Sequence, residues 1–124
     1  MELDLVRYLP LAILGAVLGL DTVSFPQAML SRPLVAATAA GALLGEPAKG
    51  LLVGVALEFF ALETLPFGAS RYPEWGGAAV VGGALFAMTP EGTAAAMTVA
   101  VLAGLVTAGL GGISMVLLRR WNAR

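Results

Sequence analysis

Short apolar stretches, each ended by glycine or proline, restrict the folds open to this chain. Residues 34–44 are apolar and end at Gly45-Glu46-Pro47, and a second largely apolar stretch, residues 51–65, ends at Pro66. Eleven residues of helix, the length of the first stretch, measure about 16 Å, half of the ~30 Å hydrocarbon core of a bilayer. Two short helices joined by a tight turn predict a re-entrant hairpin over residues 34–65, which enters a membrane and leaves by the same face. Such irregular backbone survives in a membrane only where protein or a water-filled cavity covers it.

The composition supports a membrane environment. Hydrophobic residues make up 59% of the chain and charged residues only 12%, whereas charged residues approach a quarter of a soluble domain. Sixteen glycines suit helices that pack closely in lipid. We therefore expect an all-α integral membrane protein, with residues 1–124 as one membrane domain. Besides the hairpin, helices are expected at about residues 8–20, 78–88 and 93–118, and the last is long enough to span the bilayer with tilt.

Two residue types are absent, and their absence limits the chemistry. The chain has no cysteine and no histidine, which excludes disulfides, thiolate nucleophiles, histidine metal ligands and a phosphohistidine in this chain. We expect no catalytic residue, metal or cofactor. If phosphate chemistry is involved, another protein must hold the phosphoryl group. The net charge of −1 and the lack of a basic stripe argue against nucleic acid as a partner.

Glu58 is the residue most in need of an explanation, because it lies in the middle of an apolar run. A charged acid in hydrocarbon costs about 2.5–3.5 kcal/mol on insertion scales. On a helix, Gly54 and Ala61 lie within about 60° of Glu58, so the acid shares the small-residue face expected to pack against another helix. Three roles stay open: a bond to that helix or an ion pair with Arg32 or Arg71, contact with a ligand, or proton coupling.

Other polar residues lie before and after this segment. Gln27 is a candidate binding residue, because an amide can both donate to and accept from the hydroxyl groups of a ligand, although a turn residue is the alternative. Arg32, directly before Pro33, is expected to anchor the start of the hairpin or to meet an acid. Pro66 and Gly68 break the helix beyond Glu58 and leave backbone groups that a binding site can use.

The remaining polar and aromatic residues have simpler interpretations. Glu63 and Glu74 are interpreted as loop residues, and Trp75 as a side chain at the headgroup level. Arg119 and Arg120 directly follow the longest apolar run. Because positive charge stays on the cytoplasmic side, they predict a cytoplasmic C-terminus.

Four linked motifs carry a family resemblance. They are Ser31-Arg32-Pro33-Leu34, Leu44-Gly45-Glu46-Pro47-Ala48-Lys49-Gly50, Gly54-Val55-Ala56-Leu57-Glu58 and Leu65-Pro66-Phe67-Gly68-Ala69. In this order they resemble the N-terminal half of the IIC subunit, the permease component of mannose/fructose/sorbose-family sugar phosphotransferase systems, over about residues 10–85. Family members are usually considerably longer, so three interpretations stay open: a truncated permease, a split subunit or a degenerate paralogue. Position 66 is proline, where some relatives have asparagine.

The resemblance implies a multi-pass permease of the bacterial cytoplasmic membrane that binds and translocates a hexose-type sugar. Its implied partners are a IID membrane subunit and the soluble IIA and IIB proteins, of which IIB phosphorylates the sugar, and an oligomer is expected. By this resemblance, Glu58 corresponds to the acid in the hairpin of family members, which would accept hydrogen bonds from sugar hydroxyls. The implied transport is elevator-like. Two alternatives stay open: a small proton-coupled multidrug exporter that uses Glu58, and a structural membrane subunit.

Overall fold

The computed structural model describes residues 4–21, 29–64 and 73–123. These ranges contain helices and no strand, which confirms the predicted all-α class. The helices are α1 (Leu5–Asp21), α2 (Pro33–Leu43), α3 (Pro47–Leu62), α4 (Trp75–Met88) and α5 (Ala94–Asn122).

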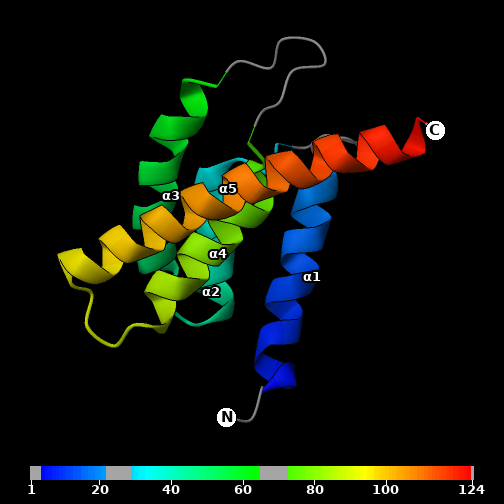
Figure 1. Ribbon diagram of the computed structural model, residues 1–124. Helices are drawn as coiled ribbons and strands as arrows, with labels where there is room; N and C mark the ends of the chain where they lie inside the picture. The colour runs from blue at the N-terminus through cyan, green and yellow to red at the C-terminus, as the bar shows by residue number, and fades with distance from the viewer. Residues whose placement is uncertain (1–3, 22–28, 65–72, 124) are drawn as a thin grey trace.

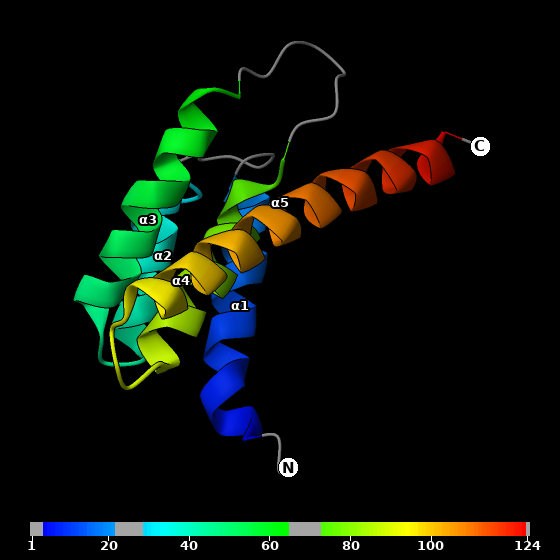
Figure 2. The same cartoon turned by 60° about the vertical axis from the view of Figure 1, so that its left-hand side comes forward.

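Helix α4 lies at the centre of the bundle. It has α3 on one side and α1 on the other, and it lies between α2 and the oblique helix α5 (Figures 1 and 2). Helices α2 and α4 run in the same direction, and α3 runs in the opposite direction (Figure 1). The first turns of α2 and α4 therefore lie at the same end of the bundle.

The turn between α2 and α3 follows directly from its residues. Gly45 has a φ of +80°, a conformation that glycine adopts without strain. Its N–H donates to the Ala42 carbonyl at 3.0 Å, and the Glu46 N–H donates to the Gly41 carbonyl at 2.8 Å. This is the Schellman arrangement that ends a helix, and Pro47 then suits the first turn of α3 because no N–H is needed there.

Helix α2 is packed between α3 and α4 at backbone distance. A Cβ atom added at Gly50 of α3 would overlap the Ala37 carbonyl, and one at Gly83 of α4 would lie 2.6 Å from the same oxygen. At Gly54 an added Cβ would lie 2.9 Å from the Pro33 carbonyl. The prediction that the small-residue face of α3 packs against a helix is confirmed.

Helix α5 presents one small-residue stripe to the bundle and exposes large apolar side chains on its other faces. Its buried residues recur at every fourth position: Ala100, Gly104, Ala108 and Gly112. Large apolar side chains such as Val99, Val106 and Leu110 are exposed. At 29 residues, or about 43 Å, α5 is the one helix in the described ranges that is long and apolar enough to span a membrane. Its C-terminal turns extend beyond the other helices (Figure 2).

Several helix ends differ from the sequence-based expectations. Helix α1 begins at Leu5 rather than near residue 8, because the Asp4 carbonyl already accepts from the N–H groups of Arg7 and Tyr8. Helix α4 begins at Trp75 rather than residue 78, and α5 continues to Asn122 rather than residue 118. Cationic side chains in a last turn favour such an extension, and α5 has two arginines there.

Candidate functional site

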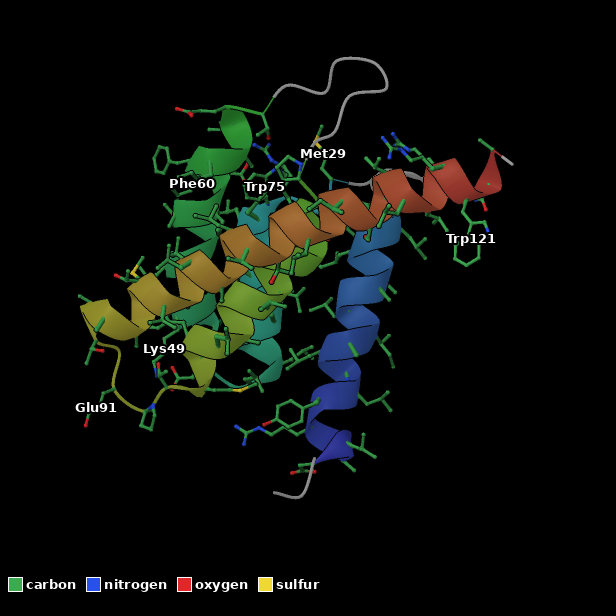
Figure 3. The ribbon with its side chains drawn as sticks, in the orientation of Figure 1. Met29, Lys49, Phe60, Trp75, Glu91 and Trp121 are labelled. Atoms are coloured by element: carbon green, nitrogen blue, oxygen red, sulfur yellow. The ribbon has the colours of Figure 1, made fainter. Side chains whose placement is uncertain are left out.

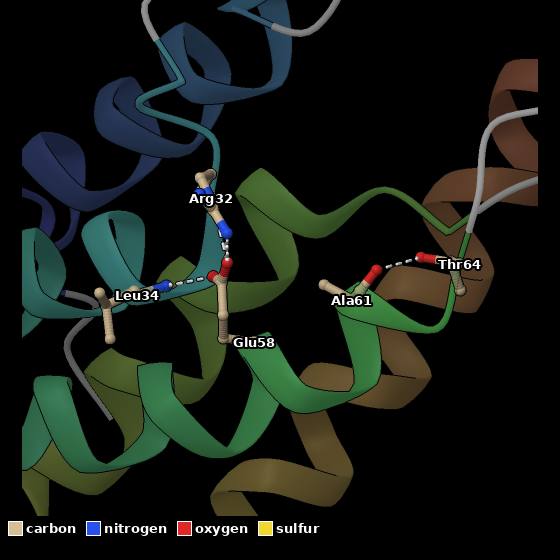
Figure 4. Close-up of polar contacts among 5 residues, drawn as sticks. All are labelled: Arg32, Leu34, Glu58, Ala61 and Thr64. Carbon is tan, nitrogen blue, oxygen red and sulfur yellow. Dashed lines mark hydrogen bonds and ion pairs between the residues drawn. The ribbon is translucent and has the colours of Figure 1, made fainter.

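The Glu58 side chain bridges the two arms of the hairpin (Figure 4). Its Oε1 accepts from Arg32 Nε at 2.7 Å and forms an ion pair with Arg32 Nη2. Its Oε2 accepts from the backbone N–H of Leu34 at 3.1 Å. Of the roles left open by the sequence, the pairing with Arg32 is therefore present in the structure.

The first turn of α2 explains why an acid is needed at this position. The first N–H groups of a helix have no partner within the helix. Arg32 occupies the N-cap position and makes no capping bond with its side chain, and Pro33 has no N–H. Leu34 therefore carries the first unpaired N–H, and Glu58 supplies its acceptor from the neighbouring helix. The carboxylate also lies at the positive end of the α2 dipole.

The pair lies at the surface of the bundle, with the acid more enclosed than the base. The Glu58 side chain is 14% exposed and the Arg32 side chain 51%. Arg32 cancels the charge of the carboxylate, which lowers the cost of placing an acid in an apolar helix. The described ranges contain no fully buried polar or charged residue.

A second set of polar contacts joins the end of α3 to the start of α4 at the same end of the bundle. Trp75 Nε1 donates to Thr64 Oγ1 at 3.1 Å, and Thr64 Oγ1 donates to the Ala61 carbonyl at 2.8 Å. Figure 3 shows Trp75 and Met29 at this end, and Lys49 and Glu91 at the opposite end. Trp75 thus has a defined hydrogen-bonding role within the bundle, besides its expected place at the headgroups.

Glu74 lies outside the helices, as the sequence predicts, but it is more than a plain loop residue because it occupies the N-cap position of α4. Its carboxylate accepts from the N–H of Gly76 at 2.9 Å and of Gly77 at 3.0 Å, and so caps α4. Its backbone N–H donates to the Ala108 carbonyl of α5 at 3.0 Å. A Cβ added at Gly111 would lie 2.7 Å from the Glu74 Cβ. Because glutamate is not among the usual N-cap residues, Glu74-Trp75-Gly76-Gly77 carries no clear capping signal in the sequence.

Comparison with known protein families adds a finding independent of this geometry. The family described as the PTS system sorbose-specific IIC component matches residues 5–123. The chain belongs to this family. It is therefore a component of a sugar phosphotransferase system, and IIC components are membrane components. Comparisons with curated proteins and with solved structures gave no match.

The family match confirms the resemblance drawn from the four motifs and extends it beyond residues 10–85 to nearly all of this IIC component. Among the motif residues, Gly45 and Pro47 form the hairpin turn, and Gly50 and Gly54 give the close contact of the two arms. Arg32 and Pro33 form the start of α2. The other residues predicted for the site or its motif lie outside the described residues: Gln27, Pro66 and Gly68. Arg71, the alternative partner of Glu58, also lies outside them.

At the opposite end of the bundle, a lysine joins the hairpin to the end of α4. Lys49 Nζ donates to the Thr89 carbonyl, which follows the last turn of α4, at 2.7 Å. Glu46 lies 3.6 Å from the same ammonium group. A cation at the carbonyl end of a helix is favourable, so Lys49 fastens the hairpin to α4. No group of three or more acidic residues in the described ranges is arranged to bind a metal ion.

Proposed function

We propose that this IIC component binds a hexose-type sugar beside Glu58, at the end of the bundle where α2 and α4 begin, and carries it across the membrane. The observation that supports this proposal is the hydrogen bonding of the Glu58 carboxylate. A carboxylate offers about four acceptor positions, of which Arg32 and Leu34 occupy three. Oε2 keeps one position for a hydroxyl group, within an apolar stretch of α3.

The charge of the site favours a neutral ligand. Arg32 already balances Glu58, so an uncharged sugar can bind without leaving a charge unpaired. A cationic drug would have to displace the Arg32 guanidinium, and this argues against the multidrug exporter. Hydrogen bonds from hydroxyls to an ionised acceptor are stronger than those between neutral groups. We further propose two more sugar contacts: Gln27, whose amide can both donate to and accept from hydroxyls, and Gly68, where the sequence predicts a break in the helix.

The proposed reaction divides the work among several proteins. Because the chain has no histidine and no cysteine, the phosphoryl group must be carried elsewhere, and we assign it to a IIB protein that receives it from IIA. A IID subunit is the proposed partner in the membrane, and the assembly is an oligomer. In the proposed topology the chain passes the bacterial cytoplasmic membrane several times, α2 and α3 form a re-entrant hairpin, and Arg119 and Arg120 hold the C-terminus in the cytoplasm.

Transport and phosphorylation assays test the proposal. Membrane vesicles with IIA, IIB and IID would be supplied with radiolabelled sorbose and a panel of other hexoses, comparing wild type with Glu58→Gln. The amide keeps the shape of the side chain but removes its charge, and we expect uptake at low sugar concentration to fall about 10-fold or more. Glu91→Gln makes the same chemical change at an exposed site at the other end of the bundle and should leave uptake unchanged.

Each contrary result has a distinct meaning. Unchanged uptake and phosphorylation in Glu58→Gln would refute the ligand role of Glu58. Exchange of a cationic drug for protons by the chain alone, without sugar uptake, would support the exporter. If the wild type transports neither a sugar nor a cationic drug when all partners are present, the structural-subunit alternative is favoured.

A further inference from the structure

The hydrogen-bonding groups that remain open in the Arg32–Glu58 pair are of two kinds. On the acid, Oε2 has one acceptor position left after Leu34. On the base, two of the five guanidinium N–H groups bond Glu58 through Nε and Nη2, and the others have no partner in the described residues. The pair therefore presents one acceptor and several donors side by side, at a point where Arg32 is half exposed.

We propose that Arg32 is a second sugar-recognition residue, which together with Glu58 binds two neighbouring hydroxyls of the sugar. One hydroxyl donates to Glu58 Oε2, and the adjacent hydroxyl accepts from the Arg32 guanidinium. This inference rests on the proposed function, because it assigns a second hydroxyl contact to the same site. The substrate class is a neutral polyol with a vicinal diol.

The chemistry of the pair favours a diol over other small ligands. Each hydroxyl is both a donor and an acceptor, so a diol can satisfy the open acceptor and an open donor together. A carboxylate or phosphate ligand would offer Glu58 no donor and would meet its negative charge. An ammonium ligand would meet the positive charge of Arg32. Only a ligand with a donor next to an acceptor uses both groups without separating them.

The position of the pair gives the contact a structural consequence. Arg32 precedes α2 and Glu58 belongs to α3, so a diol held by both side chains contacts both arms of the hairpin at once. Arg32 is thus more than an anchor for the hairpin. A purely structural Arg32 would influence every sugar analogue equally, whereas a recognition residue would influence only analogues that alter its own hydroxyl.

Monodeoxy analogues of the transported hexose provide the test. Unlabelled analogues would compete with labelled sugar for uptake by wild-type vesicles that contain IIA, IIB and IID. We expect two analogues, lacking adjacent hydroxyls, to bind about 10-fold or more weakly than the parent sugar, because each loses a bond to a charged group. If no such adjacent pair exists while the sugar is still transported, the diol proposal is overturned and the proposed function stands.

Two variants then assign each hydroxyl to its residue. In Glu58→Gln the penalty for removing one hydroxyl of the pair should shrink to about 3-fold or less, while the penalty for the other persists. In Arg32→Lys, which keeps the positive charge for Glu58 but loses the guanidinium fork, the opposite hydroxyl should lose its penalty. An Arg32→Lys variant that transports with an unchanged analogue profile would overturn the role of Arg32.

Failure of the variants to fold does not obscure the result. Arg32→Gln serves as a second substitution, and the amount of each variant in the membrane is measured directly. If all Arg32 variants are absent from the membrane, the wild-type analogue series alone decides whether an adjacent pair of hydroxyls is recognised. Absence of hexose uptake by the wild type would instead refute the proposed function itself.

Discussion

The Glu58 carboxylate joins the two arms of the hairpin through Arg32 and Leu34. It caps the first free N–H of α2, where the N-cap residue Arg32 makes no capping bond. The sequence located this acid on the interface face of its helix, since that depends only on local periodicity. The sequence did not decide whether Arg32 or Arg71 pairs with Glu58, because a contact between residues 26 positions apart depends on how the helices pack. A capped and paired acid with one open acceptor position is compatible with both structure and binding.

Glu74 leads to a prediction about stability at the same scale. Glu74→Ala removes the acceptor of the Gly76 and Gly77 N–H groups, and loss of a helix cap costs about 1 kcal/mol. We expect a lower midpoint of denaturant unfolding in detergent, followed by circular dichroism. Glu63→Ala is the control, because that exposed side chain has no bonded partner in the described residues, and it should change stability by less than about 0.5 kcal/mol. Equal effects of the two substitutions would show that the cap contributes nothing.

The helical elements differ in how far their limits can be predicted. The turn at Gly45 and Pro47 was predictable because helix termination by glycine and initiation by proline are local rules. The start of α4 was not predictable, because glutamate is outside the usual capping residues. The position of Glu74 also depends on the bond from its N–H to the Ala108 carbonyl of α5. The contact of α2 with α4 through Gly83 also depends on packing and left no distinct signal in the sequence.

Two glycines on different helices provide a matched test of the close packing. Gly50→Ala would place a methyl group onto the Ala37 carbonyl, and such overpacking costs about 1–3 kcal/mol or prevents assembly of the hairpin. Gly109→Ala adds the same methyl group in α5, where nothing lies within 4 Å, and should be neutral or stabilise by up to about 1 kcal/mol. Thermal unfolding in detergent and the yield of folded protein compare the two. If Gly50→Ala is as stable as Gly109→Ala, the hairpin arms are not in backbone contact.

At the scale of the whole molecule, helix lengths conflict with a simple bundle of full spans. Helices α2 and α4 have 11 and 14 residues, or about 16 and 21 Å, whereas α5 measures about 43 Å. A hydrocarbon core of ~30 Å is longer than the first two helices. Both begin at the same end of the bundle (Figure 1). A sugar bound beside Glu58, at that end of the short helices, would therefore be separated from the far side by only part of the membrane thickness.

Single-cysteine labelling tests this topology, since the chain has no cysteine of its own. Exposed positions suit the substitution: Glu46→Cys at the hairpin tip, Glu63→Cys at its open end, and Ala123→Cys beyond α5. With a membrane-impermeant maleimide, we expect Ala123→Cys to react only in inside-out vesicles, because the proposed topology places Arg119, Arg120 and this end of the chain on the cytoplasmic side. For a re-entrant hairpin, Glu46→Cys should react either from the face that labels Glu63→Cys or from neither face. Labelling of the two positions from opposite faces would mean that α2 and α3 each cross the membrane, and the re-entrant hairpin would be wrong.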